Sequence, residues 1–141
     1  YNMFERQKME KDYLELFDNE GMGTTIWSPL ASGFLTGKYI NGMPSGTRTS
    51  LKNYKFIKDS FESEEYADKY EKVKELQQVA DSIGIPLANL ALCWCLKNTN
   101  VSTVILGASN TEQLKQNLDS GNFMDKIDDG IIDKIDEILR K

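Results

Sequence analysis

Hydrophobic residues recur every three or four positions in two long stretches of the chain. From Glu62 to Ser82 this spacing predicts an amphipathic helix, which Gly84 ends. A second helix is predicted from Pro86, a residue suited to a first helical turn, to Leu96. Apolar residues occupy most of its positions, so we expect deep burial. These positions are Leu87, Leu90, Ala91, Trp94 and Leu96.

Strands and shorter helices complete the predicted order of elements. Two stretches rich in β-branched and apolar residues, Gly23 to Ala31 and Val101 to Leu106, predict buried strands. The Gly, Pro, Ser and Thr content from Ser32 to Lys58 predicts a long loop. The remaining predicted helices are Lys8–Glu20, Thr111–Leu118 and Gly130–Leu139, the last with Ile131, Ile135 and Ile138 on one face.

This alternation of helices and strands is typical of an α/β fold with parallel crossover connections. A parallel sheet needs more than two strands and a cover on both faces. The sequence therefore predicts that residues 1–141 form part of a larger barrel or doubly wound domain. Open strand edges expose backbone hydrogen-bonding groups, so we expect further chain or self-association as a homo-oligomer to cover them.

Composition excludes several mechanisms. The chain has no histidine, which removes Ser-His and Cys-His nucleophilic pairs and histidine-ligated zinc. Cys93 and Cys95 are too few for a disulfide framework, and we expect buried thiols in a reducing compartment. No apolar run approaches the ~20 residues of a membrane span, and Tyr1 begins no secretory signal. We expect a cytoplasmic protein, with Tyr1 as the first residue of a fragment.

Charge is distributed unevenly. The formal net charge is −5, yet no Asp or Glu occurs from Gly21 to Lys58, which we call the acid-free segment. Its five basic residues leave 12 basic against 22 acidic residues in the rest of the chain. Nucleic-acid binding favours a broad positive surface, so a small polyanionic ligand explains the pattern better than nucleic acid does. A solvated loop is the alternative. The basic residues are Lys38, Arg48, Lys52, Lys55 and Lys58.

One candidate site follows the second strand, where Ile105 to Gln113 predicts a strand end, a glycine and a helix start. Asn110 and Gln113 have the spacing of an N-cap and its reciprocal capping residue. Free amides at a helix start bind phosphate, and Gly107 permits close approach. In (β/α)₈ barrels the loops after the last two strands often form the phosphate site. Ordinary capping is the alternative, but the acid-free segment favours a ligand.

A second candidate site lies at the carboxyl end of the first strand, where Pro29 ends the strand pairing. Trp27, at its carboxyl end, could stack on a flat heterocycle, although a strand tryptophan is more often part of the core. The following turn, Ser28 to Gly33, could then contact a pyrophosphate. Lys38 and Arg48 are candidate phosphate ligands or solvated side chains, and the planar fork of arginine suits phosphate better.

These segments resemble the C-terminal part of the aldo-keto reductases, and within that superfamily the β subunits of voltage-gated potassium channels. The resemblance covers essentially the whole chain, and the motifs occur in the family's order. The matching runs are Tyr1–Arg6, Trp27–Gly33, Gly37–Tyr39, Arg48–Lys52, Leu90–Leu96 and Leu106–Leu114.

The resemblance implies an α/β fold, the C-terminal portion of an NADP-binding (β/α)₈ barrel with the end of strand six and strands seven and eight. It assigns Trp27 to the nicotinamide ring and places Lys38 in a segment folded over the cofactor. The loop along the pyrophosphate is Ser28, Pro29, Leu30, Ala31 and Ser32. The adenosine end, with its 2′-phosphate, is assigned to Arg48, Gly107, Ser109, Gln113, Gln116 and Asn117. Gly46 and Gln116 depart from the channel subunits, which often carry a tyrosine and an acid there.

The family's proton-transfer residues belong to its N-terminal half, and none maps onto this chain. The resemblance therefore implies a parent NADPH-dependent reductase of aldehydes or ketones, with this part inactive alone. One alternative is a redox-sensing cytoplasmic β subunit that regulates a potassium channel. Another is a stand-alone anion-binding half-domain, which open strand edges disfavour.

Overall fold

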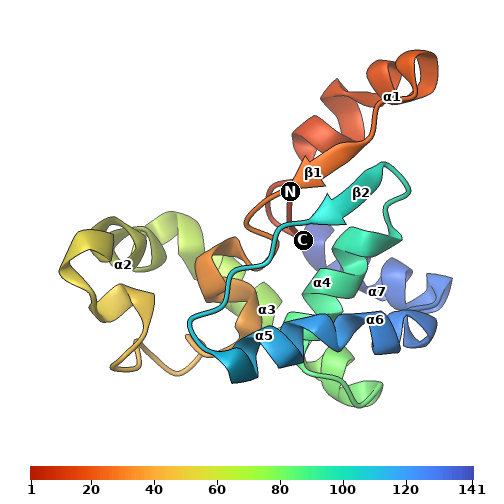
Figure 1. Ribbon diagram of the computed structural model, residues 1–141. Coiled ribbons are helices and arrows are strands. Elements are labelled where there is room, and N and C mark those ends of the chain that lie inside the picture. The colour runs from red at the N-terminus through yellow and green to blue at the C-terminus, as the bar shows by residue number, and fades with distance from the viewer.

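A computed structural model describes residues 1–141 as a two-stranded parallel sheet with most of the helices on one side of it and one helix on a projecting arm (Figure 1). The strands are β1 (Thr24–Ile26) and β2 (Val101–Val104). The α-helices are α1 (Leu14–Glu20), α2 (Lys55–Phe61), α3 (Glu64–Ser82), α4 (Leu87–Lys97), α5 (Thr111–Leu118), α6 (Ser120–Phe123) and α7 (Asp129–Arg140). A π-helical turn covers Lys8–Asp12, and 3₁₀ turns cover Ala31–Thr36, Arg48–Ser50, Lys52–Tyr54 and Met124–Lys126.

The two strands lie side by side and parallel, as the alternation of elements predicts. Thr24 pairs with Val101 and Ile26 with Val104, with one register irregularity after Thr24. Both strands are shorter than predicted. The backbone of Ser28 adopts a left-handed conformation, with a φ of 55°, which turns the chain away soon after the buried Ile26.

Helix α4 lies at the centre of the core. Nine of its eleven residues are buried, and it contacts β2, α3, α5 and α6. The deep burial predicted for this segment is therefore confirmed, with one exception. Leu96, in the last turn, is 38% exposed. Pro86 is the N-cap, with an extended ψ of 145°, and thus lies one position before the predicted first turn.

Helix α3 packs against both α4 and α7, and the apolar faces predicted for α3 and α7 are confirmed. The side chains buried along these faces are Val73, Leu76 and Ala80 on α3 and Ile131, Ile135 and Ile138 on α7. No single helix has the length and apolar composition of a membrane span, and α3 with α4 passes that test only as a pair bent by 90°.

Two predicted segments are wrong in detail. The helix expected from Lys8 to Glu20 is divided at Tyr13, where ψ is 0°, into a π-helical turn and α1. The long loop expected up to Lys58 contains three 3₁₀ turns and the start of α2. Helix α2 forms because Ile57 and Phe61, four residues apart, bury one face, with the Phe61 ring 4.9 Å from that of Phe34. This single buried pair is too short a pattern to indicate a helix from the sequence.

Candidate functional site

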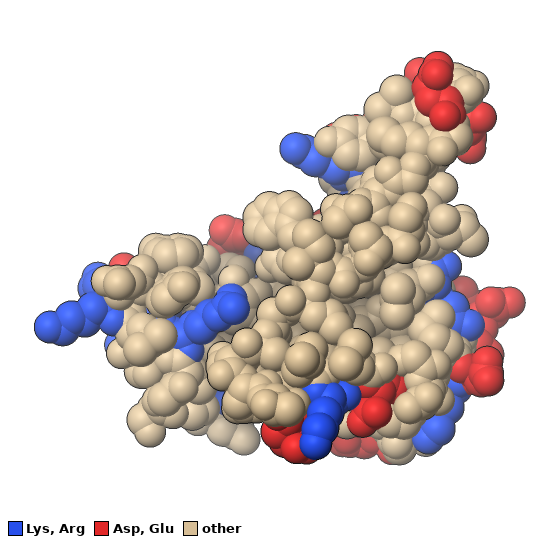
Figure 2. All heavy atoms as spheres, in the orientation of Figure 1, with Lys and Arg blue, Asp and Glu red and all other residues tan.

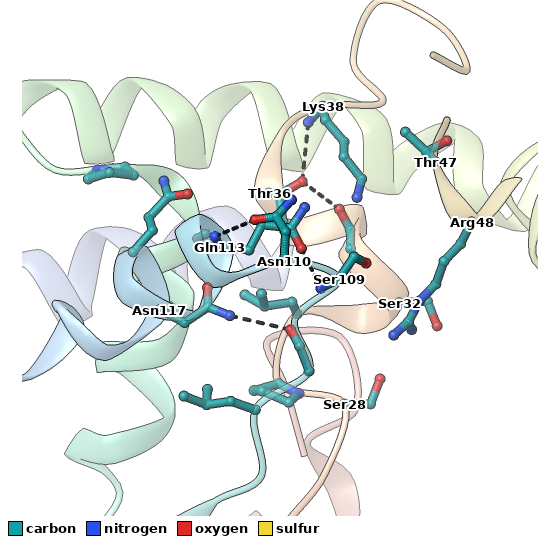
Figure 3. A pocket seen from close by; sticks show the side chains of 18 of the residues that line it. Ser28, Ser32, Thr36, Lys38, Thr47, Arg48, Ser109, Asn110, Gln113 and Asn117 are labelled. Carbon is teal, nitrogen blue, oxygen red and sulfur yellow. Dashed lines mark hydrogen bonds between the residues drawn. The ribbon is translucent and has the colours of Figure 1, made fainter. Parts of the chain in front are cut away.

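A cleft of about 660 Å³ lies beyond the carboxyl ends of β1 and β2 (Figure 3). Parallel strands end at the same edge of a sheet, so the segments that follow them meet there. The residues around the cleft come from the segment after β1, the acid-free segment, the start of α4, and the segment from β2 into α5. They are Trp27–Leu30, Ser32, Gly33, Thr36, Lys38, Gly46–Arg48, Pro86, Ala88, Ile105–Gly107, Ser109, Asn110, Gln113, Gln116 and Asn117.

The first wall begins at Trp27, which is 72% exposed although the preceding Ile26 is buried. In this chain the Trp27 ring is therefore not part of the core, and it is open to a ligand. Ser28, Ala31 and Ser32 then adopt positive φ values of 55°, 47° and 58°. Left-handed backbone at residues other than glycine is strained and is concentrated at functional loops.

The second wall is the start of α5, whose capping differs from the prediction in one partner. The Asn110 Oδ1 accepts a hydrogen bond from the backbone N–H of Gln113 at 2.9 Å, as predicted for an N-cap. The Gln113 side-chain Oε1, however, accepts a hydrogen bond from the backbone N–H of Ser109 at 2.8 Å, and not from the backbone N–H of Asn110. The amides of Thr111 and Glu112 have no partner within the fold. Two of the amide donors that can hold an anion at a helix start thus remain free.

Two cations reach the cleft without acidic partners. Neither Lys38 nor Arg48 makes a salt bridge, and no Asp or Glu lines the cleft. A Cβ added at Gly33 would lie 3.0 Å from the Lys38 Nζ, so the amine rests against this backbone. Similarly, a Cβ at Gly107 would lie 3.6 Å from the Arg48 Nη2. The absence of side chains at these glycines leaves both cations close to the main chain.

The surface follows the same division of charge. Figure 2 shows basic side chains over the lobe that carries α2, and acidic side chains at the tip of the projecting arm that carries α1. The formal net charge of the chain is −5, so a cleft with two cations and no acid is a local exception. Because the cleft is locally positive on an otherwise acidic chain, it attracts an anionic ligand.

Twelve of the thirteen residues expected to hold a cofactor line this one cleft, and Ala31 is the exception. Ala31 lies in the strained turn but does not reach the cleft surface. Thr36, Thr47, Pro86 and Ala88 also line the cleft and were not predicted. Pro86 and Ala88 belong to the start of α4, and only the packing of α4 against the sheet brings them to the cleft. Whether the thirteen residues bind a cofactor stays a prediction.

The cleft contains groups that bind and few that can transfer a proton. Its only charged side chains are Lys38 and Arg48, beside hydroxyl and amide groups and the indole of Trp27. An exposed aromatic ring, free helix-start amides and two cations can together hold a ligand with a flat ring and phosphate groups.

Comparison with known proteins bears on the identity of the chain. A family model described as "Aldo/keto reductase family" matches residues 1–140. The chain is 42% identical over 141 residues to a protein of Arabidopsis thaliana described as "Probable voltage-gated potassium channel subunit beta". The match covers 99% of this chain and 42% of that relative, so the chain spans less than half of the relative's length.

Proposed function

Because this chain belongs to the aldo/keto reductase family, we propose that it is the C-terminal, cofactor-binding part of an NADPH-dependent oxidoreductase that reduces aldehydes or ketones by hydride transfer. In this proposal β1 and β2 are the last two strands of a (β/α)₈ barrel, and the remaining strands come from the rest of the protein. The parallel pairing of β1 and β2 and the cleft at their carboxyl ends support this arrangement. Self-association into a homo-oligomer also stays a prediction.

The observation that carries the proposal is the acid-free cleft with its two unpaired cations. A dinucleotide with a 2′-phosphate brings several negative charges, and Arg48 can pair with a phosphate through two parallel hydrogen bonds. Gly107 lets this ligand approach the main chain beside Arg48. The residues present therefore fit the phosphates of NADPH, whose reduced nicotinamide supplies the hydride when the cofactor is bound.

The other lining residues take roles along the length of the cofactor. Trp27 packs on the nicotinamide ring and excludes water from one of its faces. Ser28 to Ser32 follow the pyrophosphate, and Lys38 lies in the segment that folds over the cofactor. At the adenosine end, Ser109 and Gln113 contact the 2′-phosphate region, and Gln116 and Asn117 lie beside the adenine.

The proton donor for the carbonyl lies outside this chain in the proposal. The chain has no histidine, and its cleft has no carboxylate or tyrosine. Residues 1–141 thus bind and orient the cofactor, and the isolated chain is expected to be inactive.

A second candidate function is that of a redox-sensing cytoplasmic β subunit that regulates a voltage-gated potassium channel. The 42% identity to a relative described as such a subunit favours it. The two functions share the same cleft and differ in the partner. Co-purification of the full-length protein with a channel's cytoplasmic domain would support the second function, and consistent failure to co-purify with such domains would count against it.

Tryptophan fluorescence of the full-length protein tests the cofactor site. NADPH is expected to quench the exposed Trp27, and W27A is expected to lose that part of the quenching. W94F is the matched control, because Trp94 is buried in α4 and stacks on the Tyr1 ring at 5.0 Å, away from the cleft lining. Absence of quenching, or quenching that W27A leaves intact, would contradict the proposal.

A further inference from the structure

Helix α5 forms much of one wall of the cleft, yet it buries no apolar side chain. Its one buried residue is Asn117, and its two leucines, Leu114 and Leu118, are exposed. Helices in proteins owe most of their stability to the packing of an apolar face. The position of α5 therefore depends on other contacts.

Those contacts come from Asn89, which lies in the middle of the core on α4 and is 0% exposed. Its Nδ2 donates to the backbone carbonyl of Gln116 at 2.7 Å and to the Ser120 Oγ at 2.8 Å. The Gln116 carbonyl can only accept, so it determines which end of the Asn89 amide faces α5. The Asn89 Oδ1 has no partner, and the donor end alone makes the connection.

A second side chain on the same face of α4 strengthens the connection. Cys93 lies four residues after Asn89, and its Sγ donates to the Ser120 carbonyl at 3.2 Å. The end of α5 and the start of α6 are thus bonded to α4 by two buried side chains one turn apart. On the cleft side, the Asn117 Nδ2 donates to the Gly107 carbonyl at a longer 3.4 Å.

We infer that Asn89 is a positioning residue for the adenosine end of the site: it holds α5 in the orientation that directs Gln113, Gln116 and Asn117 into the cleft. Asn89 does not line the cleft and acts through the Gln116 backbone. Without its amide, the Gln116 carbonyl loses its side-chain partner in the core, and no apolar face keeps α5 in place. The identity of the ligand rests on the proposed function, whereas the placement of α5 does not.

Hydrogen exchange of the full-length protein without ligand tests the placement. N89L keeps the branching and the number of non-hydrogen side-chain atoms but donates no hydrogen bond, and it is expected to raise exchange in residues 111–118 by about tenfold or more. S120A keeps the bond to Gln116 and is expected to raise it less than about threefold. N89Q, which keeps the donor on a longer side chain, is expected to be intermediate and serves if N89L does not fold.

D128A is the matched control for general loss of stability. The Asp128 Oδ1 caps α7 by accepting from the Ile131 amide at 2.9 Å, and Asp128 does not line the cleft. D128A is expected to destabilise the protein without a selective effect on residues 111–118. Unchanged exchange of these residues in the Asn89 variants, or an equal selective increase in D128A, would overturn the inference.

Calorimetric titration with 2′,5′-ADP, a probe of the adenosine end alone, connects the placement to binding. N89L is expected to weaken its affinity about tenfold, and D128A is expected to leave it unchanged. Wild-type affinity in a folded N89L overturns the role of Asn89 in binding. Failure of the wild-type protein to bind NADPH or 2′,5′-ADP overturns the proposed function instead, and the exchange experiment still decides whether Asn89 positions α5.

Discussion

The Arg48 guanidinium lies against the main chain of Gly107, close enough that a Cβ there would stand 3.6 Å from its Nη2. Arg48 belongs to the acid-free segment and Gly107 to the turn after β2. Their proximity joins two features that lie far apart along the chain, a basic segment and a helix start with free amides. Because Arg48 has no carboxylate partner, its charge is available to a ligand in the cleft.

Removal of this charge is expected to affect NADPH selectively. R48Q in the full-length protein should weaken NADPH binding by roughly 10- to 100-fold, since a hydrogen bond to a charged group contributes about 1.5–3 kcal/mol. NADH lacks the 2′-phosphate and should lose much less affinity. Fluorescence titrations with both cofactors measure the difference.

Lys52 provides the control for Arg48. It lies in the same segment and is exposed, but it does not line the cleft, so K52Q should leave both affinities nearly unchanged. If R48Q lost NADPH and NADH affinity equally, Arg48 would not recognise the 2′-phosphate. The same would follow if K52Q lost as much NADPH affinity as R48Q.

A side chain added at Gly33 is expected to weaken ligand binding in the cleft. Its φ is +95°, and a Cβ would lie 3.0 Å from the Lys38 Nζ, so G33A must displace that amine. G42A is the matched control, because Gly42 also has a positive φ, of +116°, but no atom within 4 Å of the added Cβ. Both variants should lose about 1–2 kcal/mol of stability, and G33A alone should weaken NADPH binding. Equal affinities in the two variants would rule out a role for the contact between Gly33 and Lys38.

The two buried thiols are expected to make stability fall at high pH. Burial raises the pKa of Cys93 to about 11 and that of Cys95 to about 12, from an ordinary 9.0. Because the folded pKa values lie above the unfolded value, the neutral thiols stabilise the fold fully below pH 9. This contribution is lost as the pH rises from about 9 toward 11 and 12.

Urea unfolding between pH 8 and pH 11 measures this contribution. The wild-type protein should lose stability with a steeper slope than the C93A/C95A variant, in which the other titrating groups remain. Parallel pH profiles for the two proteins would mean that the thiols are not protected by burial.

The buried face of α3 is expected to carry much of the stability. Leu76 is completely buried on α3, and L76A should lower the free energy of unfolding by about 2–5 kcal/mol through lost apolar contact and a cavity. L118A removes the same atoms from an exposed position on α5 and should cost far less. Urea denaturation compares the two, and a similar loss in both would contradict the assignment of Leu76 to the core.

Local pattern was a good guide to the helices of the core and a poorer one to the segment between them. The spacing of apolar residues predicts α3, α4 and α7 to within two residues because each buries a continuous face. Helix α2 was missed because only Ile57 and Phe61 are buried on it. The first strand was predicted too long because apolar periodicity does not indicate where the backbone turns to a positive φ, as it does at Ser28.

Part of the candidate cleft could be predicted because its motifs are local, and the resemblance to the family supplied the rest. Gly107, Ser109 and Gln113 lie within one capping sequence, and Trp27 directly follows a strand. Pro86 and Ala88 could not be predicted, because their place at the cleft depends on how α4 packs against the sheet. Asn89 carried no signal either, since an asparagine within an apolar helix does not reveal which distant carbonyl it will bond.

By itself, the sequence determined the helices with continuous apolar faces, the parallel order of the strands, the family, and the groups that can hold a phosphate, because each depends on spacing or chemistry within short segments. The tertiary structure decided that Lys38 and Arg48 face the same cleft as the start of α5, that Trp27 is exposed, and that Asn89 holds α5 in place. These relationships depend on side chains that meet only after the two strands pair and α4 packs beneath them, and no local pattern encodes those distances.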